Sequence, residues 1–265
     1  MSASDLSTLF AGAGLEDDAV AALDLTVDNL GDAIMAGLGD VGIDAIEQLG
    51  ATEVLLLRLL IDDSSSISYE HNADLVINGH NQVLDALLGS KASGTILVSC
   101  QFLNHGVLYP FVPLEQAVRM TSSNYHPTGS TPLYDMTAAT LSSVVAKMTE
   151  LEDGGVAVRG VTYIITDGAD YGSRTHRPAT VEAIVRGMLR SENHIIGAMG
   201  IDDHSTDFRA VFGAMGIPNQ WILTPTNNPS EIRRAFGTIS QSAVRASQAV
   251  GSFSQTALGG FGTDS

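Results

Sequence analysis

The sequence is poor in basic residues and in cysteine, and each shortage excludes a class of protein. Its 265 residues include 13 Lys and Arg against 30 Asp and Glu, which gives a net charge of −17. Because such a chain repels phosphate backbones and anionic lipid surfaces, nucleic acid and membranes are excluded as partners. The single cysteine, Cys100, cannot form an intramolecular disulfide, and we interpret it as a reduced, buried thiol.

Long apolar runs are also absent, and the N-terminal residues give poor support for a secretory leader. No stretch approaches the ~18 apolar residues that a membrane helix needs. The N-terminal residues have no Lys or Arg before a short apolar segment and soon reach Glu16, Asp17 and Asp18, which is unlike a secretory signal. We therefore expect a cytoplasmic protein.

The hydrophobic fraction of 44% can fill a sizeable core, and the length favours one α/β domain with an appendage. Residues 1–57 carry eleven acidic residues and no Lys or Arg. Apolar residues recur there every three to five positions, as in one or two amphipathic helices. We interpret residues 1–52 as an acidic helical N-terminal extension. Its apolar stripe should pack on the main domain or on a partner, with the carboxylates facing water.

From Glu53 onward, strand and helix patterns alternate. The predicted strands are Val54 to Ile61, Thr95 to Ser99, Val107 to Val112, Val158 to Thr166, His194 to Ile201 and Gln220 to Leu223. The predicted helices are Asn72 to Leu88, Pro132 to Thr149, Pro178 to Arg190, Ser205 to Met215 and Pro229 to Val250. This alternation predicts an α/β fold with a doubly wound, Rossmann-like, mostly parallel sheet and one short antiparallel edge strand, flanked by helices. We expect that domain to cover 53–246 and a flexible Ser/Gly-rich tail to cover 247–265.

Hard oxygen donors follow two of the predicted strands and begin one predicted helix. Asp62, Ser64 and Ser66 come directly after the first strand, where an extended turn would direct alternate residues to one point. Thr131 precedes a helix, and Asp167 ends another buried strand. Because ligands of doubly wound sheets bind at the carboxyl ends of the strands, these five residues predict a site for Mg²⁺, Mn²⁺ or Ca²⁺. Taken singly, each motif is more typical of an ordinary turn or helix cap.

Five further residues are candidates for the rim of this site: Asp63, His126, Asp135, Asp170 and Arg174. His126 lies in the loop that leads to Thr131, where it could reach the metal or be an ordinary solvated residue. Arg174 could pair with an incoming carboxylate. We expect Asp135 to support the start of its helix.

Taken together, the motifs identify a resemblance. Asp62, Ser64 and Ser66 match the D-x-S-x-S motif of the von Willebrand factor A (vWA) family, and Thr131 and Asp167 match the remaining positions of its metal-ion-dependent adhesion site. The resemblance covers about residues 53–240. Ser65 departs from the glycine that is frequent in the family, but it supplies no ligand.

The resemblance implies a non-enzymatic interaction module. In the family, the bound metal coordinates an Asp or Glu side chain of a protein partner. Small bacterial members that resemble this chain often work beside MoxR-type AAA+ ATPases, so the resemblance implies a cytoplasmic adaptor. Two alternatives stay open: a metal-dependent hydrolase or phosphatase that uses the same residues, and a self-assembling structural protein whose acidic helices and tail mediate association.

Overall fold

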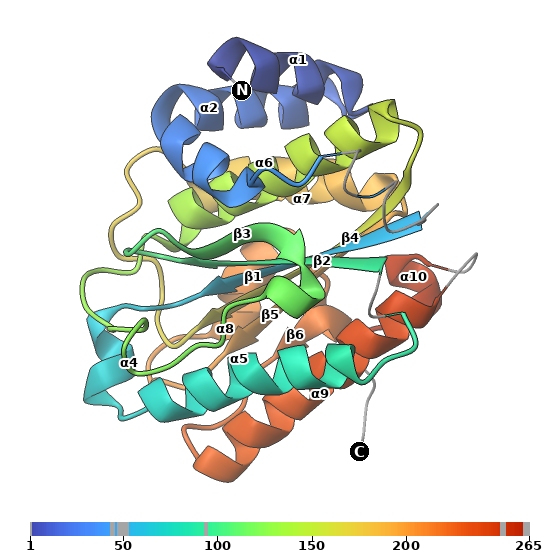
Figure 1. The fold of residues 1–265 in the computed structure, drawn as a ribbon. Coiled ribbons are helices and arrows are strands. Elements are labelled where there is room, and N and C mark those ends of the chain that lie inside the picture. The colour runs from blue at the N-terminus through green and yellow to red at the C-terminus, as the bar shows by residue number, and fades with distance from the viewer. Residues whose placement is uncertain (1, 43–45, 47–52, 93–94, 250–252, 262–265) are drawn as a thin grey trace.

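A computed structural model describes residues 2–42, 46, 53–92, 95–249 and 253–261. Its centre is a six-stranded sheet with the order β3-β2-β1-β4-β5-β6 (Figure 1). The strands are β1 (Glu53–Ile61), β2 (Ile96–Phe102), β3 (Val107–Pro113), β4 (Ala157–Thr166), β5 (His194–Gly200) and β6 (Ile222–Leu223). All neighbours pair in parallel except β2 and β3. The predicted α/β fold with one antiparallel edge strand is confirmed.

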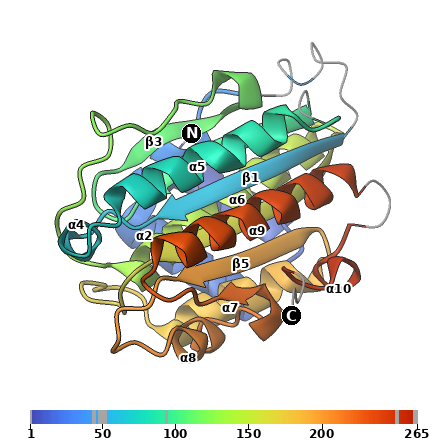
Figure 2. The same ribbon diagram turned by 90° about the horizontal axis from the view of Figure 1, so that it is seen from below.

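Helices form three layers around this sheet. They are α1 (Ala3–Gly12), α2 (Asp17–Leu38), α4 (Ser65–Tyr69), α5 (Ala73–Leu88), α6 (Leu133–Asp153), α7 (Pro178–Arg190), α8 (Phe208–Ala214), α9 (Pro229–Gln248) and α10 (Gln255–Leu258). Helices α5 and α9 lie side by side on one face of the sheet (Figure 2). Helices α6 and α7 cover the other face, and α1 and α2 lie over them (Figure 1).

The central strand explains why the sheet is covered on both faces. Every residue of Val54–Ile61 is buried, as a nearly continuous apolar run requires. Each connection between parallel strands contains a helix that packs on a face of the sheet. The carboxyl ends of β1, β4 and β5 therefore lie at the same edge.

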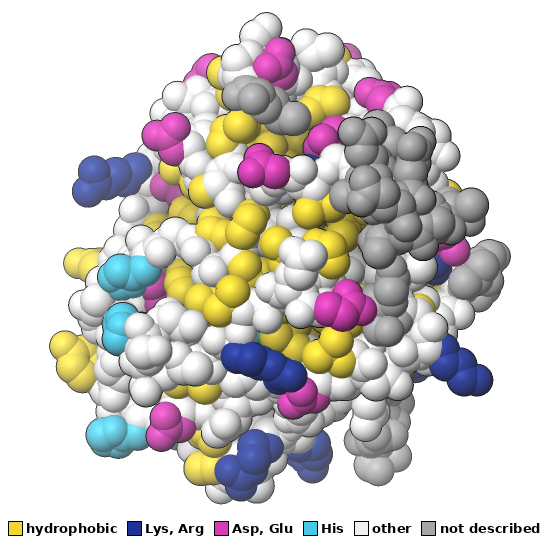
Figure 3. All heavy atoms as spheres, viewed as in Figure 1, with side chains coloured by type: hydrophobic (Ala, Val, Ile, Leu, Met, Phe, Trp, Pro, Cys, Tyr) yellow, Lys and Arg dark blue, Asp and Glu magenta, His cyan; other side chains and the backbone are white. Residues whose placement is uncertain are grey.

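The N-terminal helices pack on the sheet domain. On α2, Leu23, Val27 and Ile34 are buried, and the helix contacts α6 and α7. Ion pairs from α7 to the acidic helix, Arg186 with Asp18 among them, join the two layers at the surface. Figure 3 shows acidic and hydrophobic side chains together over this upper part of the molecule.

A buried guanidinium holds the end of α2 against the sheet. Arg58, in β1, donates hydrogen bonds to the carbonyl oxygen of Gly37 at 3.4 Å and to the side chains of Ser99 and Gln101. Burial lowers its pKa to about 10, so the side chain stays charged at neutral pH. A cation beside the last turn of a helix is favourable because the carbonyl dipoles point toward it.

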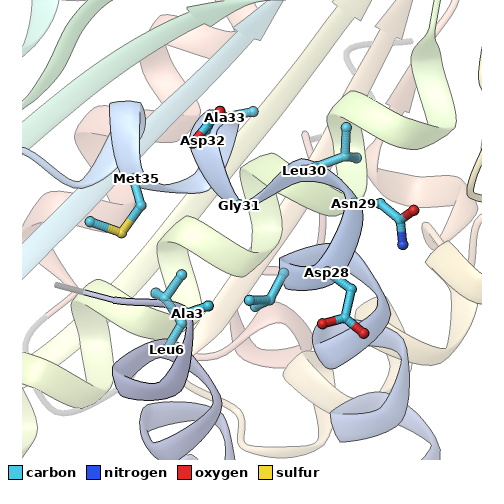
Figure 4. Close-up of a pocket in the computed structure, with 10 residues that line it drawn as sticks. Ala3, Leu6, Asp28, Asn29, Leu30, Gly31, Asp32, Ala33 and Met35 are labelled. Carbon is cyan, nitrogen blue, oxygen red and sulfur yellow. The ribbon is translucent and has the colours of Figure 1, made fainter.

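Helix α2 is kinked. Leu30 leaves the helical region of backbone conformation, with φ −132° and ψ 22°. The kink borders a pocket of about 550 Å³ between α1 and α2, lined by Leu6, Val27 and Met35 with Asp28 and Asp32 also on its wall (Figure 4). No predicted metal ligand lines this pocket.

Part of the predicted flexible tail lies against the sheet. Phe261 is buried, with its ring centroid 5.8 Å from that of Tyr163 and 5.3 Å from that of Trp221. Gln255 accepts a hydrogen bond from the backbone N–H of Ile196 in β5 at 3.1 Å. Residues 253–261 of the predicted tail are therefore placed against the sheet through Phe261 and Gln255.

In the part of the chain that the structure describes, no helix combines the length and the hydrophobicity that crossing a membrane requires.

Replacing Leu23 by Ala should lower the free energy of unfolding by about 2–4 kcal/mol, since the side chain is fully buried beneath α2. Leu25→Ala is the matched control. Its side chain is 39% exposed on the same helix, so the loss should stay below about 0.5 kcal/mol. Urea unfolding measures both. Equal losses would contradict the packing of α2 on the domain.

Acid should destabilise the protein through His194. Burial lowers the pKa of this side chain to about 4 in the folded state, from 6.5 in the unfolded chain. Between these values only the unfolded state binds the proton, so stability falls as the pH drops from about 6.5 to about 4. His194→Leu should make the pH dependence of the unfolding free energy shallower by up to about 1.4 kcal/mol per pH unit. An unchanged slope in denaturant titrations would contradict this account.

Candidate metal centre

The five predicted donors come from three segments at the carboxyl edge of the sheet. Strands β1 and β4 are neighbours, with Ile61 opposite Ile165. The N–H of Asp62 extends this ladder by donating to the carbonyl oxygen of Ile165 at 2.8 Å. Asp62 and Asp167 therefore leave adjacent strands side by side.

The first segment is a tight turn that runs into α4. Asp62 accepts hydrogen bonds from the N–H of Ser64 at 2.7 Å and from the hydroxyl of Thr166 at 2.5 Å. The hydroxyl oxygens of Ser64 and Ser66 are 2.9 Å apart, and Ser66 donates to Asp167 at 2.5 Å. The structure therefore brings Asp62, Ser64, Ser66 and Asp167 together. The turn is extended only as far as Ser64, because α4 begins at Ser65.

The second segment carries Thr131, and backbone hydrogen bonds fix its position. The N–H of Thr131 donates to the carbonyl oxygen of Tyr171 at 2.9 Å, and the N–H of Tyr171 donates back at 2.8 Å. The same loop is tied to the first segment, since the hydroxyl of Tyr125 donates to the carbonyl oxygen of Asp62 at 2.5 Å. Thr131 is thus anchored to both neighbouring segments.

Gly168 leaves space among these donors. A Cβ at this position would lie 3.6 Å from the hydroxyl oxygen of Thr131 and 4.0 Å from that of Ser66. A larger side chain there would extend into the space that the two hydroxyls border. The sequence did not single out Gly168 as the residue that keeps this space open, because Asp-Gly is also a common turn.

Asp167 is buried, and one of its carboxylate oxygens, Oδ2, has no hydrogen-bond partner among the described residues. Its pKa is raised to about 7, mainly by burial and in smaller part by the nearby carboxylate of Asp62. The pKa of Asp62 is also raised, mainly by burial. An unpartnered buried carboxylate oxygen is costly, and a cation is the group that would satisfy it.

The chemistry of the donors narrows the kind of cation. Two carboxylates and three hydroxyls form a set of hard oxygen ligands, which suits Mg²⁺, Mn²⁺ or Ca²⁺. Among the residues that the structure describes, no cluster of three or more His, Cys, Asp and Glu forms a different kind of metal site.

Asp63 points away from the donors. One of its oxygens accepts from the N–H and the side chain of Asn104, at 2.8 and 3.0 Å. The other accepts from the N–H of His105 at 3.0 Å and lies 2.5 Å from its ring Nδ1. Asp63 thus anchors the loop that follows β2, on the side away from the donors with which it alternates along the turn.

Asp135 and Asp170 organise the loop that follows Asp167. Asp135 accepts hydrogen bonds from the backbone N–H groups of Arg174 at 2.7 Å and of His176 at 2.7 Å. Asp170 accepts from the N–H of Tyr134 at 3.1 Å. Both carboxylates lie at the start of α6: Asp170 accepts from its backbone, and Asp135, in its first turn, holds the neighbouring loop.

The other two predicted rim residues are exposed. Arg174 contributes its backbone N–H to the loop structure, while its side chain faces solvent. His126 is exposed as well, and its Nε2 lies 3.1 Å from the carbonyl oxygen of Ser123 in its own loop.

No family model and no curated protein matches this sequence. Among solved structures, the pilus adhesin SpaC from Lactobacillus rhamnosus GG, in its open conformation, aligns with a TM-score of 0.51 and 13% identity over 73% of this chain. Proximal thread matrix protein 1 from the mussel byssus aligns with a TM-score of 0.47 and 16% identity over 73% of this chain. Manganese-loaded TRAP from Plasmodium vivax aligns with a TM-score of 0.44 and 20% identity over 70% of this chain.

The alignments cover less than half of the length of two of these proteins. This chain covers 30% of SpaC, 47% of the byssus protein and 74% of TRAP. Of the three, only SpaC has a TM-score above 0.5, and at 13% identity it shows the fold alone. The chain has a mostly parallel, doubly wound α/β fold, which it shares with the aligned part of SpaC.

Proposed function

We propose that this chain is a divalent-metal-dependent protein interaction module that binds an acidic side chain of a partner. One observation carries the proposal: the hydroxyl of Ser66 lies beside that of Ser64 and donates to Asp167, whose second carboxylate oxygen is buried without a partner among the described residues. The vWA resemblance of the sequence supports it, and SpaC, with which the chain shares its fold, is an adhesin.

The hydroxyls of Ser64, Ser66 and Thr131 would hold the cation directly, and Asp62 and Asp167 would balance its charge. Both oxygens of Asp62 already accept hydrogen bonds, so this carboxylate suits a role through water. When bound, the metal supplies an electrophilic position for one outside oxygen. Because the chain is strongly acidic, a local positive charge is what allows a partner's carboxylate to approach.

The partner itself is a finer proposal. The resemblance to small bacterial members of the vWA family favours a MoxR-type AAA+ ATPase, with this chain as its cytoplasmic adaptor.

A metal-dependent hydrolase remains the second candidate. Its general base would be His105, whose half-exposed ring has Nδ1 2.5 Å from Asp63, the neighbour of Asp62 in the sequence. Hydrolysis of para-nitrophenyl phosphate that requires Mg²⁺ and is lost in His105→Ala would support the enzyme. Absence of turnover in Mg²⁺ and in Mn²⁺ would support the interaction module.

Calorimetric titration of Mg²⁺, Mn²⁺ and Ca²⁺ into the metal-free protein tests the site. We expect one binding event per chain that is lost in Asp62→Ala, because the turn loses the carboxylate that orients Ser64. Asp28→Asn is the matched control, since it removes one exposed carboxylate far along the chain from the donors and should leave binding unchanged. Equal binding in all three proteins would contradict the site.

Asp167→Asn should stabilise the metal-free protein above pH 7, on the order of 1 kcal/mol, because it removes a buried charge that, within the described ranges, has a hydrogen-bond partner on only one of its two oxygens. The same substitution should abolish the rise in melting temperature that Mg²⁺ causes in the wild type. Thermal unfolding with EDTA and with Mg²⁺ measures both effects. A variant that is destabilised in EDTA yet still responds to Mg²⁺ would show that Asp167 has only a structural role.

A further inference from the structure

Two tyrosines project from the molecule. Among the described residues, five large hydrophobic side chains are exposed, and Tyr69 and Tyr171 are by far the most exposed, at 78% and 80%. The other three, Leu25, Leu88 and Val118, reach only 39–43%. Large apolar side chains with this degree of exposure are typical of binding surfaces when they gather around one site.

Both tyrosines lie on the segments that carry the predicted metal ligands. Tyr69 is the last residue of α4, three positions after Ser66. Tyr171 follows Asp167 by four positions and shares two backbone hydrogen bonds with Thr131. In Figure 3, hydrophobic side chains protrude at the left edge of the molecule, the side on which α4 lies in Figure 1.

Backbone hydrogen bonds to the predicted metal ligands hold the two tyrosine segments in place. The pair of hydrogen bonds between Thr131 and Tyr171, at 2.9 and 2.8 Å, fixes one tyrosine relative to a metal ligand. Beside the other, the N–H of Glu70 donates to the carbonyl oxygen of Ser66 at 2.9 Å, and its carboxylate accepts from Asn227. Since the backbone is already held in place, binding a partner should cost little conformational entropy beyond that of the side chains.

We propose that Tyr69 and Tyr171 form an aromatic rim that selects the partner: a protein segment whose metal-binding Asp or Glu is flanked by large apolar side chains. This inference rests on the proposed function. A tyrosine ring buries a large apolar area at low entropic cost, and its hydroxyl keeps it soluble in the free protein. The metal then recognises the carboxylate, and the rim distinguishes among the many acidic segments that present one.

The test uses three pentapeptides with a central Asp and either Gly, Leu or Lys on both sides, titrated into the full chain in excess Mg²⁺ and followed by NMR. We expect the Leu-flanked peptide to bind about tenfold more tightly than the Gly-flanked one. Tyr69→Ser and Tyr171→Ser should each reduce this preference several-fold while leaving Mg²⁺ affinity unchanged. Leu88→Ser is the matched control, because it removes an exposed apolar side chain from the far end of α5.

The outcomes separate the two proposals. If all three peptides bind equally and only with Mg²⁺, the interaction module stands and the aromatic rim is overturned. Retention of the full Leu preference in both tyrosine variants overturns the rim as well. If Mg²⁺ binds but no peptide does, both proposals are overturned.

Discussion

Two carboxylates buried side by side are the constraint on which the rest of the structure depends. Asp62 and Asp167 end adjacent parallel strands, so the sheet itself forces them together at one edge. Burial raises the pKa of both side chains, and a neighbouring carboxylate adds to the effect: that of Asp63 at Asp62 and that of Asp62 at Asp167. Asp62 is stabilised by hydrogen bonds on both oxygens, whereas Asp167 keeps one oxygen without a protein partner. One buried carboxylate oxygen, that of Asp167, is therefore left without a partner in the part of the chain that the structure describes, and a cation is the group that would stabilise its charge.

The surrounding loops are joined to one another and to the more distant helices. Asp63 anchors the loop after β2, and Asp135 anchors the loop after Asp167. The imidazole of His176, next to Asp135, also contacts the hydroxyl of Thr26 in α2 at 2.8 Å. The N-terminal helices therefore touch the edge of the site, which makes them part of the framework that positions it. Such a framework keeps the donors preorganised for a ligand.

The sequence predicted the sheet and the convergence of donors well, because both follow from local patterns. A buried run such as Val54–Ile61 marks a central strand, and a residue directly after it must lie at the carboxyl edge. Features that depend on distant partners were not predictable. Arg58 lies in an apolar run, and its contact with Gly37 gives no local signal. The loop that Asp63 anchors depends in the same way on residues far along the chain.

The measurement that tests the central claim most directly is the anomalous difference density of a crystal soaked in Mn²⁺. The account predicts one strong peak within coordination distance of the hydroxyl oxygens of Ser64, Ser66 and Thr131, next to the unpartnered oxygen of Asp167. A saturated crystal with no peak there, or with its only strong peak elsewhere on the acidic surface, would contradict the claim that these carboxylates and hydroxyls form a metal centre.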